Sequence, residues 1–287
     1  MSQSLAPAAA PTADLERAVE VLQDAHVAVL TGAGMSTDSG IPDYRGPGSV
    51  RATPMQYAEF VGSREAQRRY WARSYLGFQR MGAAVPNAGH RALARWQEHG
   101  VEGVVTQNVD GLHRAAGSRR VVELHGEIAQ VVCLACGSTT SRRVVQERLA
   151  LLNPETAAAH GTADDRLQHA ELRPDGDAVV TDWSTFRLAD CIRCAGPLKP
   201  DVVFFGERVP LDRVAASYAL VDHGDVLLVA GSSLTVMSGL RFVRHAFKHR
   251  KPVVIINRGP TRGDEFATVK LDAGCSETLS GLAARLA

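Results

Sequence analysis

Short, mainly apolar runs recur along the chain, and each ends at a glycine or a polar residue. Such runs predict short strands, and runs without strict alternation are typical of a sheet that is covered on both faces. The runs are Val27–Leu30, Val101–Gln107, Val121–Leu124, Asp201–Phe205, Asp225–Ala230, Pro252–Ile256 and Val269–Leu271.

Between most of these runs, apolar residues recur every three or four positions, which predicts amphipathic helices. Strands that alternate with helices predict an α/β fold, here a Rossmann-like parallel sheet with helices on both faces. Residues 50–62 have no clean period, so we expect a mobile loop there that closes over a ligand. The helical segments are Asp14–Ala25, Arg64–Arg80, Asn87–His99, Val214–Val221, Gly239–Lys248 and Ser276–Leu286.

Residues 126–200 differ from the rest because they hold two CxxC pairs and few long apolar runs. Four thiolates can bind one zinc ion tetrahedrally and leave no open position, so we expect a structural zinc. The gap between the pairs exceeds the usual spacing of roughly 15–20 residues, which predicts an insertion at about residues 141–189. Redox or disulfide-forming cysteines are the alternative. The expected ligands are Cys133, Cys136, Cys191 and Cys194.

The same patterns predict the domain organisation. Residues 1–12 are expected to form a disordered Ala/Pro tail. Residues 13–125 and 201–287 are expected to form the Rossmann-like domain, and residues 126–200 an inserted small zinc-ribbon module. A ligand is then expected at the carboxyl ends of the strands, where open α/β sheets bind their ligands.

Polar residues follow the predicted strands. Gly32-Ala33-Gly34 follows the first strand, and residues 36–39 are good helix N-caps, so a strand, a glycine turn and a helix start predict a phosphate site. Thr37 stands where the dinucleotide fingerprint has its third glycine. Ordinary turns are the alternative for this segment and for the other polar groups after strands, which are Gln107, Asn108, Asp110, Gly231, Ser232, Ser233 and Asn257.

His125 follows a predicted strand and precedes a glycine, in the sequence ELHG. A histidine at a strand end is well placed to act as a general base. A surface or core histidine without a chemical role is the alternative for any of the 10 histidines in the chain.

Residues 40–45 (GIPDYR) place a proline, a carboxylate, an aromatic ring and a guanidinium in four consecutive positions. Together with the glycine turn, the stretch GAGMSTDSGIPDYR resembles the cofactor-binding signature of the sirtuins, the NAD-dependent protein lysine deacylases. The resemblance runs from about Val27 to Cys275, and LKPDVVFFGE, GSSLTVMSGLRF and NRGPTRGDE are most similar to the class II branch. Residues 46–48 (Gly-Pro-Gly) are closer to other branches.

This resemblance implies an NAD site, catalytic residues and a substrate edge. It implies that His125 is the general base, that Asn108 assists catalysis, and that Val203, Phe205 and Gly206 lie on the edge that pairs with an acyl-lysine peptide, in the cleft between the domains. The implied NAD-binding residues are Gly32, Ala33, Gly34, Thr37, Asp43, Tyr44, Arg45, Gln107, Asn108, Asp110, Gly231, Ser232, Ser233, Asn257 and Cys275.

The resemblance also implies the reaction. The acyl oxygen of a modified lysine attacks the ribose carbon as nicotinamide leaves, and His125 then draws a proton from the ribose hydroxyls. The products are O-acyl-ADP-ribose and free lysine. Asn108 and Asp110 would orient the ribose and the nicotinamide, and Tyr44 would shield the reactive ribose face from water.

Tyr70 and Arg73 suggest the class of acyl group. Their i, i+3 spacing places them on one helix face, where a hydroxyl and a guanidinium can hold a carboxylate. The pair resembles the Tyr-x-x-Arg pair that selects succinyl groups in another sirtuin branch, so we expect acidic or long acyl groups. A solvated, charge-rich helix face is the alternative.

Composition and charge narrow the partners and the location. The 287 residues are 45% apolar and carry a net charge of +1, which gives no electrostatic reason for nucleic-acid binding. No apolar run approaches the roughly 18 residues of a membrane span, and the start lacks the basic residues of a secretory or transit signal. We therefore expect a cytoplasmic protein without nucleic-acid or membrane partners. The sequence carries no signal for an oligomeric state.

Three other functions use the same features. The first is an ADP-ribosyltransferase with the same NAD site, the second a non-catalytic NAD-sensing zinc protein, and the third a zinc-ribbon nucleic-acid binder. The intact residues 107–110 and His125 count against the second, and the balanced charge counts against the third.

Overall fold

The larger part of the fold is built on a six-stranded sheet in which every neighbouring pair is parallel. The computed structural model describes residues 12–44, 54–159 and 182–286. The strand order is β3-β2-β1-β7-β8-β9. The predicted parallel α/β sheet is therefore confirmed. The strands are β1 (Val27–Thr31), β2 (Val101–Thr106), β3 (Val121–Glu123), β7 (Val226–Ala230), β8 (Val253–Ile256) and β9 (Val269–Leu271).

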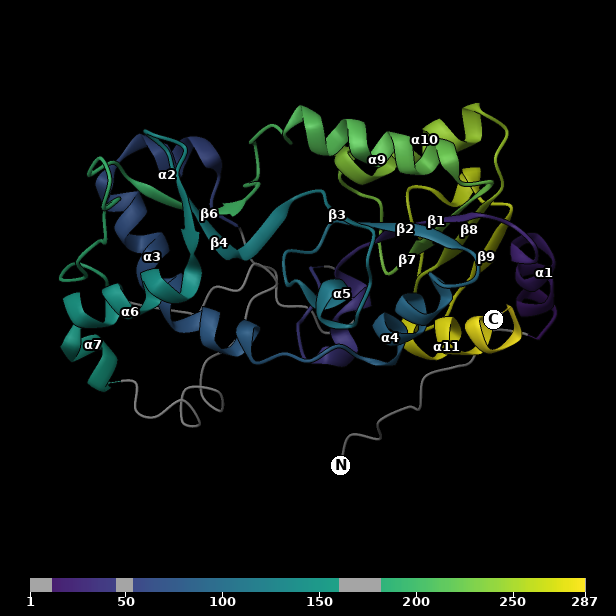
Figure 1. The fold of residues 1–287 in the computed structure, drawn as a ribbon, viewed down its shortest axis with the longest axis horizontal. Coiled ribbons are helices and arrows are strands. Elements are labelled where there is room, and N and C mark those ends of the chain that lie inside the picture. The colour runs from purple at the N-terminus through teal and green to yellow at the C-terminus, as the bar shows by residue number, and fades with distance from the viewer. Residues whose placement is uncertain (1–11, 45–53, 160–181, 287) are drawn as a thin grey trace.

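Helices cover both faces of this sheet because successive strand residues point to opposite sides. Val27 and Val29 pack into a core with helices α1 (Thr12–Leu22), α4 (Ala88–Trp96) and α11 (Cys275–Leu286). Ala28 and Leu30 pack on the other side with α9 (Leu211–His223) and α10 (Met237–Lys248). Figure 1 shows α9 and α10 on one side of the strands and α4 and α11 on the other.

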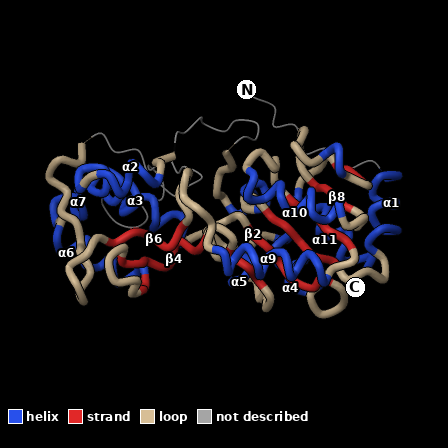
Figure 2. The backbone as a smooth tube through the Cα atoms, turned by 90° about the horizontal axis from the view of Figure 1, so that it is seen from above, coloured by secondary structure: helices blue, strands red, loops and turns tan. Residues whose placement is uncertain are grey.

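A second, three-stranded antiparallel sheet lies at the far end of the molecule (Figure 2). Its order is β5-β4-β6, so β6 is an edge strand. The side chains of Phe60, Trp71, Val131, Leu149 and Phe204 are buried in one core with this sheet. The elements are β4 (Gly126–Cys133), β5 (Thr139–Ser141), β6 (Leu198–Val202), α2 (Tyr57–Gly62), α3 (Arg64–Gly82), α6 (Arg142–Leu152) and α7 (Pro154–Ala159).

Two expectations about these elements were wrong. The strand expected at Asp201–Phe205 ends at Val202, and it belongs to the antiparallel sheet rather than to the parallel one. Residues 57–62, expected to be part of a mobile loop, form helix α2, whose Phe60 is fully buried. Burial of this aromatic ring stabilises a helix too short to show a clean period. Residues 50–53 of the expected loop lie outside the described residues.

Helices α2 and α3 pack with the smaller sheet and not with the parallel sheet. Residues 13–125 were expected to form part of the sheet domain, whereas these two helices pack with the antiparallel sheet. Trp71 on α3 is 2% exposed, and its indole N–H donates to the Leu198 carbonyl oxygen at 3.0 Å. The smaller unit is thus assembled from two stretches of the chain.

The segment after β1 differs from its prediction as well. In place of the start of an α-helix, two short 3₁₀ turns follow, η1 (Ala33–Met35) and η2 (Thr37–Ser39). The Asn87 side chain binds this segment. Its Nδ2 donates to the Met35 carbonyl oxygen at 2.8 Å, a group that an α-helix would pair within itself, and to Ser39 Oγ at 3.1 Å. Across the described part of the chain, no helix is long and apolar enough to cross a membrane.

Candidate active site

One large cavity, with a volume of about 1420 Å³, lies at the carboxyl ends of β1, β2, β7 and β8. From β1 the chain continues to β2 and β3 on one side of β1, whereas β7, β8 and β9 follow on its other side. The cavity therefore lies where the order of the strands reverses, between β1 and β7. Such switch points are the usual ligand sites of open α/β sheets. The cavity continues to Val202, the last residue of the edge strand of the smaller sheet, and to residues 203–211 after it.

Glycines bring the loops after β1 and β7 into contact. Gly34 N–H donates to the Gly231 carbonyl oxygen at 2.9 Å. Gly231 has a φ of +66°, and a Cβ atom there would lie 2.3 Å from Met35 N. Only glycine fits this left-handed, crowded position. The glycine turn therefore joins two strand ends, and Gly32, Ala33 and Gly34 all line the cavity.

A hydrogen-bond network joins the polar residues after β2 to the glycine turn. Asn108 Nδ2 donates to the Gly32 carbonyl oxygen and to Ser36 Oγ, both at 3.0 Å. Ser36 Oγ donates to Asp110 Oδ2 at 2.7 Å. Burial raises the pKa of the Asp110 carboxyl, while hydrogen bonds from Leu112 and Ser36 lower it. The network fixes one amide and one carboxylate at the wall of the cavity.

His125 lies in this cavity with both ring nitrogens hydrogen-bonded. Nδ1 lies 2.9 Å from the Gln107 carbonyl oxygen, and Nε2 lies 2.9 Å from Ser238 Oγ. Burial lowers the pKa of His125, and the charges of Arg241 and Arg213 lower it further, while the Gln107 carbonyl raises it. The imidazole is therefore neutral near pH 7 and can accept a proton.

The segment after β6 is held in place next to His125. Val203 N–H donates to the His125 carbonyl oxygen at 2.8 Å. Phe204 N–H donates to Glu207 Oε2 at 2.8 Å, and Tyr57 N–H donates to the Phe205 carbonyl oxygen at 2.9 Å. This wall of the cavity thus leaves β6 at Val203 and closes into a turn in which Glu207 N–H donates to the Phe204 carbonyl oxygen at 3.0 Å, with hydrogen bonds from backbone and from the Glu207 side chain fixing it.

Most of the site residues expected from the sequence line this one cavity. Tyr44 also packs against the Phe205 ring, with ring centroids 6.1 Å apart. The lining residues from the predicted set are Gly32, Ala33, Gly34, Asp43, Tyr44, Tyr70, Gln107, Asn108, Asp110, His125, Val203, Phe205, Gly206, Gly231, Ser232, Ser233 and Asn257.

Three expected residues do not line the cavity. Thr37 is exposed, and its hydroxyl donates to the Gly34 carbonyl oxygen at 3.1 Å. Cys275 is buried next to Ile256, and burial raises the pKa of its thiol to about 12. Arg73 lies on α3 away from the lining, one turn from Tyr70. Arg45 lies outside the described residues, so its expected role stays a prediction.

The cavity also contains residues that the sequence reading missed. The sequence predicts only a helix cap at Ser36, whereas its hydroxyl links Asn108 and Asp110. Ser238 and Arg241 line the cavity from α10. No local signal identifies Ser238, because its partner His125 is 113 positions away.

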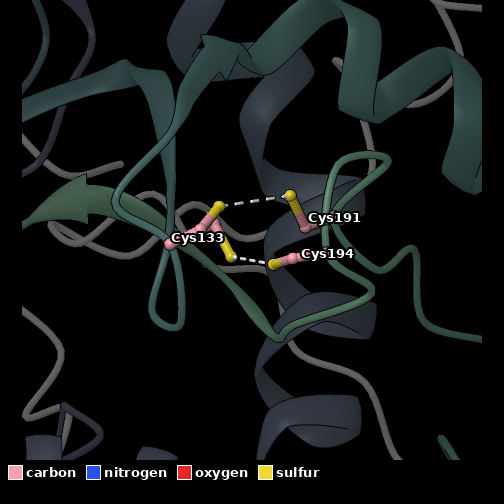
Figure 3. A group of neighbouring side chains, drawn as sticks. Cys133, Cys191 and Cys194 are labelled. Atoms are coloured by element: carbon pink, nitrogen blue, oxygen red, sulfur yellow. Dashed lines mark hydrogen bonds between the residues drawn. The ribbon is translucent and has the colours of Figure 1, made fainter.

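The four CxxC cysteines form a cluster in the smaller unit. Their sulfur atoms all lie within 4.8 Å of one another. Cys133 Sγ lies 3.5 Å from Cys194 Sγ, and Cys136 Sγ lies 3.8 Å from Cys191 Sγ. Zinc–sulfur bonds of about 2.3 Å in a tetrahedron require sulfur–sulfur distances of about 3.8 Å. The cluster therefore fits zinc, and Figure 3 shows the sulfur atoms turned toward one another.

Comparisons with known proteins place this geometry in a family. The Sir2 family model matches residues 32–238. The chain is 56% identical over 273 residues to "NAD-dependent protein deacetylase 1" of Mycobacterium avium, covering 93% of this chain and 94% of that protein. It is 44% identical over 284 residues to human "NAD-dependent protein lipoamidase sirtuin-4, mitochondrial", covering 94% and 87%.

A solved structure supports the same assignment. The structure titled "Sir2-p53 peptide-NAD+" matches with a TM-score of 0.72 at 28% identity, covering 94% of this chain and 98% of that one. The resemblance to the sirtuins, drawn from the glycine turn and the residues after it, is confirmed. The chain belongs to the Sir2 family.

Proposed function

We propose that this protein is an NAD-dependent protein lysine deacylase that transfers the acyl group to ADP-ribose. One observation carries the proposal. A neutral histidine, an anchored amide and the backbone segment that follows edge strand β6 all face one cavity at the switch point of a parallel sheet. The related proteins named as NAD-dependent deacetylases support the same reaction.

NAD fits the part of the cavity between the strand ends. When bound, it supplies the ribose carbon that accepts the acyl oxygen. The close glycine contacts after β1 and β7 leave backbone rather than side chains at the cavity wall, which suits a dinucleotide. We propose that Gly32, Ala33, Gly34, Gln107, Ser232 and Asn257 contact the cofactor.

Nε2 of His125 is the atom that takes the proton from the ribose hydroxyl. The Gln107 carbonyl can only accept, so the ring proton is on Nδ1, and Nε2 carries the lone pair. Asn108 and Asp110 orient the ribose and the nicotinamide, because Ser36 and the Gly32 carbonyl hold them at the wall. Tyr44 shields the ribose face from water.

The acyl-lysine peptide is proposed to lie along Val203–Gly206. This segment directly follows the edge strand β6, and the edges of sheets pair readily with an added strand. Two related structures have titles that name a bound peptide, "Sir2-p53 peptide-NAD+" and "Sir2 bound to acetylated peptide". For this chain we propose acyl-lysine proteins as substrates.

The acyl group is proposed to be acidic or long. Tyr70 is 6% exposed and lines the cavity near Phe204, with their ring centroids 5.0 Å apart. Arg73 is one helical turn further along α3. A shift of its long side chain toward Tyr70 would bring a guanidinium to an acyl carboxylate.

The remaining parts of the proposal concern the zinc and the location. The four cysteine ligands hold a structural zinc, because four thiolates leave no position for a substrate or water. A cytoplasmic location stays a prediction, which rests on CxxC pairs in a chain that needs reduced thiols.

The proposed function is tested by turnover of one peptide that bears different acyl groups, with and without NAD. Mass spectrometry distinguishes the two reactions that share the NAD site. A deacylase removes the acyl group and yields O-acyl-ADP-ribose, whereas an ADP-ribosyltransferase adds ADP-ribose to a protein. An acylated peptide that is unchanged in the presence of NAD, for every acyl group, would contradict the proposal.

A further inference from the structure

We propose that Ser238 is a positioning residue for the base, because its hydroxyl donates to His125 Nε2 and fixes the rotation of the neutral ring, and it releases this lone pair when a ribose hydroxyl delivers its proton there. The inference rests on the proposed function and adds a residue to it. Neither the QNVD stretch nor the ELHG stretch contains this serine. Its place is on α10, in the sequence VMSGLRF.

Hydrogen-bond chemistry fixes the direction of this contact. The Gln107 carbonyl oxygen accepts from Nδ1 at 2.9 Å, so the neutral ring has its only proton on Nδ1. Nε2 is then an acceptor, and Ser238 Oγ, 2.9 Å away, must be the donor. The two contacts on opposite sides of the ring fix both its tautomer and its rotation.

Ser238 is placed by a close backbone approach. Helix α10 begins at Met237, and Gly239 lies against the side chain of Gln107. A Cβ atom on Gly239 would lie 2.7 Å from Gln107 Nε2. Ser232 Oγ donates to Gln107 Oε1 at 2.7 Å and holds that side chain. The first turn of α10 is thereby fixed against the residue whose carbonyl binds His125.

The charges around the ring favour the same neutral form. Arg241 lies on α10 one turn after Ser238, and Arg213 lies on α9. Both cations oppose protonation of the imidazole, and the N-terminus of α10 adds the positive end of its dipole. The carbonyl of Gln107 opposes them by favouring the charged ring. The hydroxyl of Ser238 and the two arginines therefore all favour the neutral imidazole of His125.

Removal of this hydroxyl should affect the base more than the cofactor site. Without the donor, Nε2 is free to bind water or a proton, and the ring can rotate. The neutral, correctly aimed fraction of His125 falls. A lost hydrogen bond of this kind corresponds to about a tenfold decrease in kcat. Binding of NAD should change little, because the glycine turns remain intact.

The experiment compares Ser238→Ala, Ser238→Thr and wild type in the NAD-dependent deacylation assay. We expect kcat of Ser238→Ala to fall about tenfold, with the KM for NAD changed less than twofold. We expect the acid limb of its kcat/KM profile to move to higher pH, since protonation of Nε2 is no longer opposed by the hydroxyl. Thr keeps a hydroxyl on Cβ and should restore most of kcat.

The control is Ser280→Ala. This serine also lies in a helix and donates to a backbone carbonyl, that of Ser276 at 2.7 Å, on α11. It should leave kcat and the pH profile unchanged. Unchanged kcat and pH profile in Ser238→Ala, with an active wild type, would overturn the inference alone. A wild type without NAD-dependent deacylation would instead contradict the proposed function.

Discussion

Lys199 Nζ lies 3.1 Å from Glu207 Oε2, and only 5% of the lysine side chain is exposed. The same carboxylate oxygen accepts from Phe204 N–H at 2.8 Å. This buried pair thus anchors the segment along which we propose that the peptide binds. Burial lowers the pKa of Lys199, and Glu207 opposes that shift.

Breaking the pair should therefore destabilise the protein and loosen the substrate edge. Glu207→Gln keeps an acceptor for Phe204 but removes the nearest counter-charge of the buried ammonium and leaves only the weaker effect of Asp201, so we expect a loss of about 3 kcal/mol in the free energy of unfolding. Urea titration measures this loss, and the KM for the peptide should rise. The double variant Lys199→Met/Glu207→Gln should recover part of the stability. A double variant no more stable than Glu207→Gln would contradict this account.

The zinc cluster should be essential for folding of the smaller unit. Cys191→Ser removes one thiolate, and structural zinc contributes on the order of 10 kcal/mol in small modules. We expect release of zinc, measured by a colorimetric chelator, and a lower melting temperature. Cys275→Ser is the matched control, since its thiol lies outside the cluster. Loss of zinc without a change in melting or activity would show that the metal is not structural.

The parallel sheet was predictable because its strands are short, mainly apolar runs. All five residues of β1, for example, are buried, and the run from Val27 is visible in the sequence. Polar residues such as Asn108 and His125 follow such strands, so their shared cavity was predictable from the sheet alone. The resemblance to the sirtuin signature then predicted which cofactor and which reaction these residues serve.

The contacts between distant segments were not predictable in this way. The helical pattern of α3 indicates a buried face but does not say which sheet covers that face. Trp71 on α3 packs beneath the Arg142 guanidinium, 4.7 Å from the ring centroid. Likewise, the hydroxyl of Ser36 is taken by Asp110, 74 residues away, so the expected helix cap did not form. Such choices depend on tertiary geometry that local patterns do not encode.

A pair of buried histidines should make stability depend on pH. The rings of His90 and His113 have centroids 4.8 Å apart, and burial lowers their pKa values to about 4 and about 3. Their unfolded pKa is near 6.5, so their full contribution to stability is present above that value, and it is lost as pH falls from there to the folded pKa values, because the unfolded chain binds protons that the folded one does not. From His90 alone we expect the free energy of unfolding to decrease by about 3 kcal/mol between pH 6.5 and pH 4.

Urea titration at several pH values measures this dependence. His90→Gln should flatten the decrease in the free energy of unfolding over this range. His99→Gln is the matched control, because that histidine is exposed and lies just after the same helix. Equal slopes for His90→Gln and wild type would refute the assignment of this effect to His90.

The preference for one acyl group over another should depend on Arg73 if its guanidinium binds a carboxylate on the acyl group. We expect Arg73→Met to lower turnover of succinyl- and glutaryl-lysine peptides about tenfold relative to acetyl-lysine, since a charge-assisted hydrogen bond is lost. Arg68→Met, on the same helix, is the control. An unchanged ratio of acidic to neutral acyl turnover in Arg73→Met would show that the guanidinium does not select the acyl group.

The central claim is that His125 is the base of an NAD-dependent deacylation. The direct measurement is mass spectrometry of an acyl-lysine peptide incubated with NAD and either wild type or His125→Ala, together with NAD binding by calorimetry. We predict free lysine peptide, nicotinamide and O-acyl-ADP-ribose from wild type. We predict a loss of about 10²–10⁴-fold in rate for His125→Ala with NAD still bound. Near-normal deacylation by His125→Ala, or transfer of ADP-ribose to protein in place of deacylation by wild type, would contradict the account.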